Sequence, residues 1–312
     1  MNIIIAGAGA MGSRFGLMLH KAGNDVILID GWADHVNQIN QAGLEANFNG
    51  EVIIEKLPAY HQTDCQSIDF SADLVILFTK AMQLDGMMQA IQPMLSEKTQ
   101  VLCLLNGIGH EDVIKNYVPY DNILLGNTMW TAGIEGPGKV KLFGNGSIDL
   151  QNLGENRASA EQVVEVLSAA DLNARYSDSI LSSIYKKACV NGTMNGLCTI
   201  LDTNMAGFGE TTVADSIVES IVAEFAAIAE KEHAHLNVDE VLAQIKTCYD
   251  RSTIGLHHPS MYQDLITNHR LTEIDYINGA IVRKGKEYGI ATPYCSFLTD
   301  LVHAKEQIMG VK

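Results

Sequence analysis

The chain has 312 residues, of which 47% are hydrophobic and 19% charged, and its 21 basic and 37 acidic residues give a formal net charge of −16. This composition is typical of a compact globular protein and too apolar for intrinsic disorder, and the length suits two domains. The acidic excess argues against nucleic acid or an anionic membrane as a partner. No apolar run approaches the roughly 20 residues that span a bilayer.

Six scattered cysteines, none of them in a C-x-x-C pair, indicate free thiols in a reducing compartment, so we expect a cytoplasmic protein. The apolar start MNIIIAGAGA lacks the basic region of a signal peptide, and its glycine spacing has another use.

Residues 1–150 alternate short β-type runs with helical patterns. We expect strands at 2–6, 25–30, 72–78 and 100–105, with a helix after the first strand through Leu19. This alternation predicts a doubly wound, Rossmann-type α/β domain. Asn49-Gly50 between apolar flanks predicts a hairpin, and the turn residues over 133–150 predict an antiparallel excursion near the domain's end.

After about residue 172 the pattern becomes helical, which predicts a Rossmann-like dinucleotide-binding domain over 1–172 and an all-helical substrate and catalytic domain over 173–312. The apolar spacing over 217–230 suits a core or an interface, so the choice between a monomer and a homodimer stays open. Thr272 and Asp275 resemble a capping box that opens a helix ending at Gly289. Thr292-Pro293 predicts the start of a last helix running towards Gly310.

A glycine motif follows the first predicted strand and opens a helix. It consists of Gly7, Ala8, Gly9, Ala10, Met11 and Gly12, in the pattern G-x-G-x-x-G. In this setting the glycines permit a tight turn, close approach of a pyrophosphate and helix–strand packing, while free helix N-terminal amides hold the phosphates. The motif predicts dinucleotide binding.

Asp30 ends the second predicted strand, 18 residues after Gly12. A carboxylate there can accept hydrogen bonds from ribose hydroxyls and repels a 2′-phosphate, and residues 31–34 supply no Arg or Lys to offset that repulsion. We therefore expect NAD, with NADH preferred over NADPH. The alternative is a helix N-cap or a solvated turn.

Two short loops follow later strands, T-K-A-M-Q over 79–83 and N-G-I-G over 106–109. Ligands of open α/β sheets bind at the carboxyl ends of strands, which places Lys80 and Asn106 near the cofactor. Judged from spacing alone, ordinary turn roles for Lys80 and Asn106 are as well supported as cofactor contacts.

The stretch YKKACVNGTMNG places Lys187, Asn191 and Asn195 at i, i+4 and i+8, so a helix aligns them on one face. These polar groups interrupt an apolar setting, and buried polar groups need partners. We expect the stripe to face a cleft. Ser260 in HHPSMYQD and Glu273 in RLTEIDYING are the other polar groups of this half that require an explanation.

Taken together, these motifs resemble those of the ketopantoate reductases (2-dehydropantoate 2-reductases) along essentially the whole chain. The matching segments are the N-terminal G-x-G-x-x-G, T-K-A-x-Q (79–83), N-G-x-G (106–109), K-x-x-x-N-x-x-x-N (187–195), S-M-x-x-D (260–264) and T-E-I-D-Y-I-N-G (272–279). The resemblance implies reduction of ketopantoate to pantoate, for pantothenate and coenzyme A biosynthesis.

The resemblance also implies roles for individual residues. Lys187 would be the general acid and Glu273 would help hold substrate, while Lys80 would lie by the cofactor. Substrate contacts would come from Asn106, Asn191, Asn195 and Ser260, and Asn106 would also meet the cofactor. Two positions depart from the family pattern: Asp30 replaces a basic residue that many members carry, and His257 replaces an expected asparagine.

These roles suit hydride transfer, because the alkoxide formed from a ketone must be protonated and an ammonium group can supply that proton. Two alternatives remain: a related reductase of another small 2-oxo acid, and a non-catalytic NAD(H)-binding sensor, which would need neither Lys187 nor Glu273. The histidine pairs at 233/235 and 257/258 have the wrong helical spacing for a shared metal, and we expect no metal site.

Overall fold

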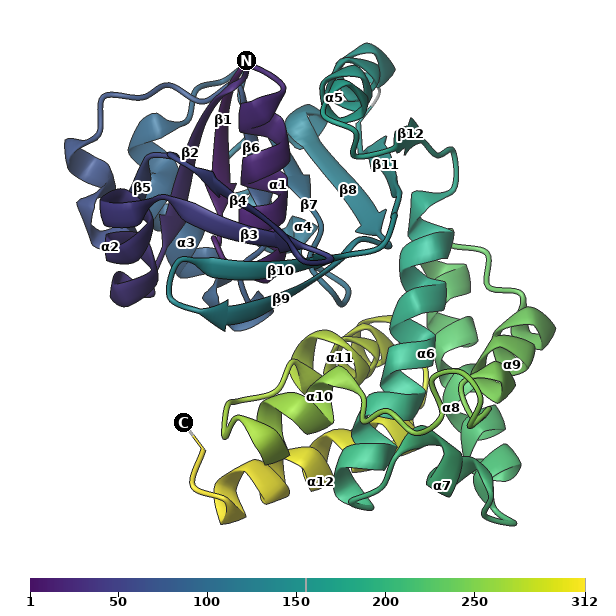
Figure 1. Cartoon of the computed structure of the whole chain (residues 1–312). Coiled ribbons are helices and arrows are strands. Elements are labelled where there is room, and N and C mark those ends of the chain that lie inside the picture. The colour runs from purple at the N-terminus through teal and green to yellow at the C-terminus, as the bar shows by residue number, and fades with distance from the viewer. Residues whose placement is uncertain (155, 312) are drawn as a thin grey trace. The chain divides into compact units, whose positions relative to one another are not determined.

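The structure is a computed structural model that describes residues 1–154 and 156–311. Contacts divide it into two compact units (Figure 1). The sheet unit comprises Met1–Leu105 and His110–Ile180, and the helical unit comprises Asn106–Gly109 and Leu181–Lys312. The short loop at 106–109 therefore belongs by its contacts to the helical unit, although its neighbours in sequence lie in the sheet unit.

The sheet unit is built on an eight-stranded sheet of order β12-β11-β8-β7-β6-β1-β2-β5. Its strands are β1 (Asn2–Ala6), β2 (Asp25–Asp30), β5 (Ala59–His61), β6 (Leu74–Leu77), β7 (Gln100–Cys103), β8 (Ile123–Thr128), β11 (Ile148–Asn152) and β12 (Ala174–Tyr176). The run from β5 to β8 is parallel, and β11 pairs antiparallel with β8. The predicted Rossmann-type α/β domain is confirmed.

A second sheet of four strands has the order β4-β3-β10-β9. Its strands are β3 (Leu44–Phe48), β4 (Glu51–Glu55), β9 (Thr131–Gly136) and β10 (Lys139–Phe143). Asn49 and Gly50 form the predicted two-residue hairpin turn, both with positive φ as the twist of antiparallel strands requires. The β9–β10 pair is the predicted antiparallel excursion.

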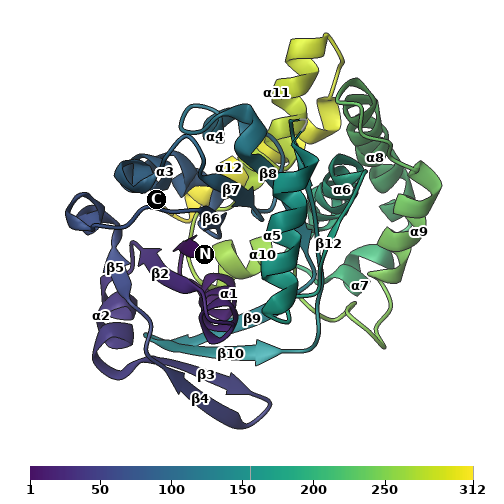
Figure 2. The same cartoon turned by 90° about the horizontal axis from the view of Figure 1, so that it is seen from above.

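Helix α1 (Ala10–Lys21) lies between the two sheets, while α3 (Leu84–Ile91) and α4 (Glu111–Ile114) lie on the opposite side of the large sheet (Figure 2). The other helices of this unit are α2 (Ala33–Ala42) and α5 (Arg157–Ala169). Buried Ile3, Ile5, Phe15 and Leu28 belong to one apolar core that fixes α1 against β1 and β2. This packing holds the start of α1 beside the ends of both strands.

The helical unit contains α6 to α12 (Figure 1). Their bounds are α6 (Ile180–Ile200), α7 (Met205–Gly209), α8 (Ala214–Lys231), α9 (Val238–Thr247), α10 (Ser260–Tyr262), α11 (Asn278–Tyr288) and α12 (Pro293–Ile308). A π-helical turn, η5, covers Gln263–Thr267, and a 3₁₀ turn, η6, covers Ile274–Tyr276. The predicted all-helical second part of the chain is confirmed.

Helix α8 contains the apolar stretch predicted at 217–230, and its buried Val218, Ile221, Phe225 and Ile228 belong to the core of this unit. These side chains therefore provide no independent argument for an interface. All six cysteines are buried and unpaired, as expected. Across 1–154 and 156–311, no helix combines the length and apolar character needed to cross a bilayer.

The helix predicted between Thr272 and Gly289 begins later than expected. The chain first forms η6 and then departs from helical geometry at Ile277 (φ −112°, ψ −92°) before α11 begins. The Thr272 hydroxyl accepts from the Ile274 amide at 3.3 Å, which is a local turn rather than a capping box. The far end is as predicted, with Gly289 in the left-handed conformation after α11.

Candidate active site

The glycine motif forms the turn between β1 and α1. Gly7 has φ +96°, and a Cβ there would lie 2.6 Å from the Phe78 carbonyl carbon, while a Cβ on Gly12 would lie 1.9 Å from the Gly7 oxygen. Backbone packing thus requires both glycines. By contrast, nothing in the described residues lies within 4 Å of a Cβ added to Gly9, the N-cap of α1. Open space at a helix N-terminus with no acidic side chain in its first turn suits a pyrophosphate.

Asp30 binds the glycine turn directly. Its Oδ2 accepts from the Ala8 amide at 2.6 Å, and its Oδ1 accepts from the Trp32 amide at 2.8 Å. A carboxylate has about four acceptor positions on its two oxygens. Two therefore remain for ribose hydroxyls, so Asp30 serves the loop and is also compatible with the predicted cofactor contact. Lys80 is half-buried and follows β6 as the N-cap of a 3₁₀ turn over Ala81–Gln83.

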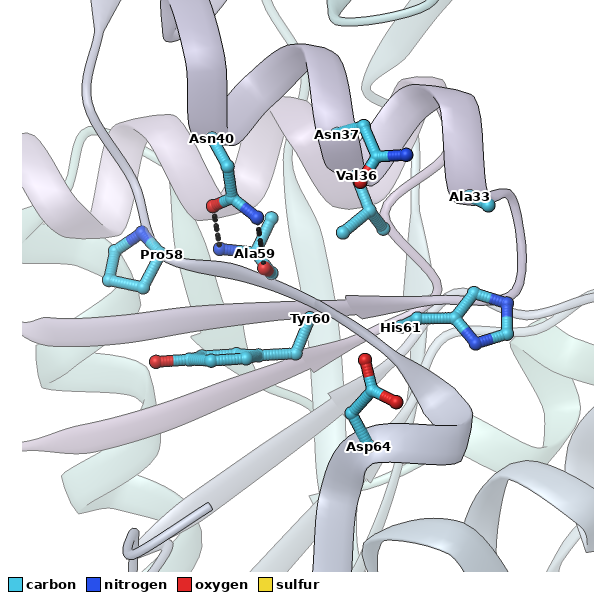
Figure 3. Close-up of a pocket in the computed structure, with 9 residues that line it drawn as sticks. All are labelled: Ala33, Val36, Asn37, Asn40, Pro58, Ala59, Tyr60, His61 and Asp64. Atoms are coloured by element: carbon cyan, nitrogen blue, oxygen red, sulfur yellow. Dashed lines mark hydrogen bonds between the residues drawn. The ribbon is translucent and has the colours of Figure 1, made fainter. Parts of the chain in front are cut away.

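A separate groove of the sheet unit, about 400 Å³ in volume, lies between α2 and β5 (Figure 3). It is lined by Ala33, Val36, Asn37, Asn40, Pro58, Ala59, Tyr60, His61 and Asp64. The Asn40 amide donates to the Ala59 carbonyl at 2.7 Å and accepts from the Ala59 amide at 3.1 Å. Asn40 thereby covers the outer backbone groups of an edge strand, a structural role. The groove contains none of the predicted site residues.

The Lys187–Asn191–Asn195 stripe lies on the single long helix α6, as predicted. Most of this helix is buried, including Ala188, Cys189 and Met194. The Asn195 amide faces Ser260, with its Nδ2 3.4 Å from the Ser260 Oγ. The stripe therefore faces other polar groups of the helical unit.

A small cavity, about 10 Å³ in volume, collects most of the predicted residues of this unit. Its lining comprises Asn106, Asn191, Asn195, Ser260, Met261, Asp264, Glu273 and Ile277. Three amides, a hydroxyl and two carboxylates converge there, from four separate segments of the chain. Such a set can bind a small molecule carrying several oxygen atoms.

Asn106 reaches this cavity because its loop docks on the segment that carries Glu273. The Ile108 amide donates to the Tyr276 carbonyl at 2.8 Å. Gly107 has φ +107°, and a Cβ there would lie 2.4 Å from the same Tyr276 oxygen. The glycine of the N-G-x-G motif is thus required by a close backbone approach.

Lys187 and Glu273 interact electrostatically. Burial lowers the pKa of Lys187, and the negative charge of Glu273 partly offsets that shift. A lysine with a lowered pKa gives up a proton more readily than a solvated one, which is what a general acid requires. Both residues therefore have an environment that fits the predicted chemistry.

Asp264 is a cavity residue to which the sequence assigned no role. It is buried, and its Oδ1 accepts from Arg270 at 2.7 Å. The segment S-M-x-x-D contains it, so the motif itself was the available signal. Met261 and Ile277 supply the apolar part of the lining and were also missed.

His257 is exposed and is absent from the cavity lining, and the ring of His258 stacks on Tyr262 at 3.9 Å. Within 1–154 and 156–311, no group of three or more His, Cys, Asp or Glu side chains could hold a metal ion.

Two family models cover most of the chain. Residues 3–155 match "Ketopantoate reductase PanE/ApbA", and residues 179–306 match its C-terminal counterpart. The chain belongs to the ketopantoate reductase family.

Individual relatives agree with this assignment. A 2-dehydropantoate 2-reductase of Lactococcus lactis subsp. lactis (strain IL1403) is 63% identical over 100% of both chains. A PanE/ApbA family ketopantoate reductase from Ralstonia eutropha JMP134 is 27% identical, with a TM-score of 0.88 over 99% of this chain and 100% of that one. A solved D-mandelate dehydrogenase, in a ternary structure with NADH and anilino(oxo)acetate, is 63% identical over 100% of both chains, with a TM-score of 0.93.

Proposed function

We propose that this ketopantoate reductase family member reduces ketopantoate to pantoate with a hydride from NADH, as a step of pantothenate and coenzyme A biosynthesis. The observation that carries the proposal is the helical-unit cavity, which gathers Asn106, Asn191, Asn195, Ser260 and Glu273, together with the electrostatic coupling of Glu273 to Lys187. The 63% identical 2-dehydropantoate 2-reductase supports the choice of substrate.

In this proposal NADH, when bound, supplies the hydride. Lys187 donates a proton from Nζ to the oxygen of the former ketone, which converts the developing alkoxide to a hydroxyl, and solvent then returns a proton to Lys187. The ammonium also stabilises the negative charge as it develops. Glu273 accepts a hydrogen bond from a substrate hydroxyl and holds Lys187 electrostatically.

The uncharged groups of the cavity have positioning roles. Asn191 and Asn195 hydrogen-bond the substrate oxygens, and Ser260, which faces Asn195, contributes to holding the carboxylate. Asn106 contacts both the substrate and the cofactor, and Lys80 lies by the cofactor. Amides and hydroxyls orient an anionic substrate without adding charge, so the proton stays under the control of Lys187 and Glu273.

Initial rates with ketopantoate, pyruvate and phenylglyoxylate, each with NADH and with NADPH, test the proposal. Phenylglyoxylate is the 2-oxo acid that corresponds to mandelate, and the 63% identical D-mandelate dehydrogenase makes it the sharpest competitor. The highest kcat/KM is expected for ketopantoate. A clear preference for phenylglyoxylate would instead identify a reductase of another 2-oxo acid, and no turnover of any substrate would favour the sensor.

The NADH preference rests on Asp30. A 2′-phosphate would bring like charge against this carboxylate in a partly desolvated site, which should cost at least a few kcal/mol by analogy with like-charge contacts at interfaces. Relatives with NADH in their solved structures support nicotinamide binding. Wild type should therefore show a higher kcat/KM with NADH than with NADPH.

Replacing Asp30 by Asn or Ser should raise kcat/KM for NADPH and lower it for NADH, and Trp32→Arg should add to the shift by supplying a guanidinium. Because Asp30 also accepts two backbone amides, its variants require a control for loop damage. Asp34→Asn removes a nearby exposed carboxylate and should leave kcat/KM unchanged for both NADH and NADPH. Equal or better efficiency of wild type with NADPH would refute the NAD preference.

We also propose two domains that meet near residue 172, where the sequence switches from mixed to helical patterns; by contacts the sheet unit extends to Ile180 and so includes β12. A homodimer and a cytoplasmic location remain predictions. Light scattering of the purified chain tests the first, and fractionation of cells that express it tests the second.

A further inference from the structure

Three side chains form a charged cluster next to the segment that carries Glu273. His303 and Glu306 lie on α12, and Asp275 lies on η6. His303 Nδ1 is 2.9 Å from Glu306 Oε2, and His303 Nε2 is 3.0 Å from Asp275 Oδ1. We call Asp275, His303 and Glu306 the His303 triad.

The triad geometry favours a protonated ring. A neutral imidazole carries one N–H, so it can donate to only one of the two carboxylates and turns a lone pair towards the other. The imidazolium donates from both nitrogens, and hydrogen bonds between charged partners are the stronger kind. The charged form therefore best satisfies an arrangement with both nitrogens at about 3 Å from carboxylate oxygens.

The triad holds the Glu273 segment from both ends. The Thr272 amide, immediately before Glu273, donates to Glu306 Oε1 at 2.8 Å, and both Thr272 and Glu306 are buried. Asp275, two residues after Glu273, bonds His303 directly. The ring of His303 thus ties residue 272, through Glu306, to residue 275.

We propose that protonated His303 is a positioning residue that fixes Glu273 for substrate binding. This inference rests on the proposed substrate-binding role of Glu273. It adds a residue outside the cavity lining that acts through Thr272 and Asp275, and it makes substrate affinity depend on pH through a group other than Lys187.

The charged groups that face His303 are Glu306 from its own helix and Asp275 from η6, while Arg283 of α11 donates to the Asp275 carbonyl at 2.7 Å. Burial of the ring lowers the pKa of His303, but its bonds to Glu306 and Asp275 and their charges raise it more, so the net shift is upward. The stabilisation that comes from a raised histidine pKa is fully present below the pKa of the unfolded chain, about 6.5, and is lost as pH rises through the pKa of the folded protein. The segment that carries Glu273 should therefore become less firmly held at pH values above the folded-state pKa of His303.

The first experiment measures kinetics against pH for wild type, His303→Gln, His303→Arg and the control His235→Gln, which changes an exposed histidine. In wild type and the control, KM for ketopantoate should rise about twofold to tenfold as pH increases through the pKa of His303. This factor corresponds to the net free energy of one typical hydrogen bond. The glutamine variant should show the raised KM at every pH. The arginine variant, permanently charged, should keep a low KM with no inflection, and at any one pH kcat should differ little among the four proteins.

An inflection in KM that persists in both His303 variants would overturn the proposal. So would a glutamine variant with wild-type KM and only a lower melting temperature, because that result describes a purely structural residue.

The second experiment needs no turnover. The His303 ring is titrated by NMR in wild type and in Glu306→Gln, and exchange of the Thr272 amide with solvent is followed across the same pH range. The buried Ala234 amide is the internal reference, because it bonds the Ala229 carbonyl and not the Glu273 segment. The pKa of His303 should fall in Glu306→Gln. Protection of the Thr272 amide, relative to Ala234, should fall as His303 loses its proton.

Unchanged relative protection of Thr272 in His303→Gln would refute the triad even if ketopantoate is the substrate. Conversely, if wild type shows the expected loss of protection but does not turn over ketopantoate, the proposed function fails while the triad stands.

Discussion

Replacing Lys187 by alanine removes the proposed proton donor and the positive charge that interacts with Glu273. An ammonium about 4 Å from a developing alkoxide, in surroundings with an effective dielectric constant near 20, stabilises it by about 4 kcal/mol. Because about 1.4 kcal/mol corresponds to a factor of ten in rate, kcat should fall by about 10³. This value lies within the range of about 10² to 10⁴ for lost general acid catalysis.

The adjacent residue provides a matched control. Lys186 lies on the same turn of α6, but its Nζ forms an exposed ion pair with Glu240 at 3.3 Å. Exposed pairs of this kind contribute little to stability, so Lys186→Ala should retain near wild-type kinetics. Stopped-flow single turnovers with saturating NADH and ketopantoate measure the chemical step, and fluorescence titration checks that NADH still binds. Near wild-type turnover by Lys187→Ala, or an equal loss in Lys186→Ala, would refute the assigned role.

The pH dependence of kcat gives a second check on the same residue. A general acid must be protonated, so kcat should decline as pH rises through the pKa of Lys187, which burial lowers from its ordinary value. The decline should therefore begin at a lower pH than for a solvated lysine. It should appear in kcat, whereas the triad affects KM.

Three further outcomes are expected. Glu273→Ala should raise KM for ketopantoate and lower kcat/KM, measured by steady-state kinetics, and a loss of thermal stability alone would show that Glu273 only shapes its turn. Gly12→Ala should abolish NADH binding and lower the melting temperature, because its Cβ would lie 1.9 Å from the Gly7 backbone oxygen. Gly9→Ala, which has open space around it, should weaken NADH binding but keep the wild-type melting temperature. Finally, His35 is buried and accepts from the Gly138 amide at 2.9 Å, and burial lowers its pKa. The contribution of His35 to the free energy of unfolding should therefore be fully present above about pH 6.5 and should be lost as pH falls towards the pKa of the folded protein. Thermal melts across pH should show this decline in melting temperature, and a smaller one in His35→Asn.

The fold was predictable where local pattern and global packing agree. The run NIIIA and the following glycines specify a buried strand and a turn that no other residue could form at Gly7 or Gly12. Asn49-Gly50 specified its hairpin for the same kind of local reason. The start of α11 was mispredicted, because contacts from distant residues decide the conformation there. The Thr272 amide bonds Glu306, 34 residues away, and is therefore unavailable for the capping box that the local sequence suggested.

The same distinction applies to the candidate site. Helical spacing was sufficient to align Lys187, Asn191 and Asn195, because that relation lies within one helix. The docking of the 106–109 loop on Tyr276 joins residues about 170 positions apart, and no periodicity in the sequence encodes it. Asp264 was visible in a motif, but its burial and its Arg270 partner depend on the π-helical turn. Composition and spacing identify candidate groups, and long-range packing decides which of them meet.

The polar residues of α6 separate into two sets by where their hydrogen bonds go. Thr193 donates to the Cys189 carbonyl at 2.8 Å and Thr199 to the Asn195 carbonyl at 2.7 Å, so each threonine is satisfied within its own helix. Asn195 and Lys187 instead interact with Ser260 and Glu273, which other segments supply. A largely buried helix can hold threonines that hydrogen-bond within the helix at little cost in stability. A buried polar group whose partners lie on other segments instead lowers the stability of the fold whenever those partners move away. The stripe is therefore better explained by the proposed substrate binding and proton transfer than by a contribution to folding.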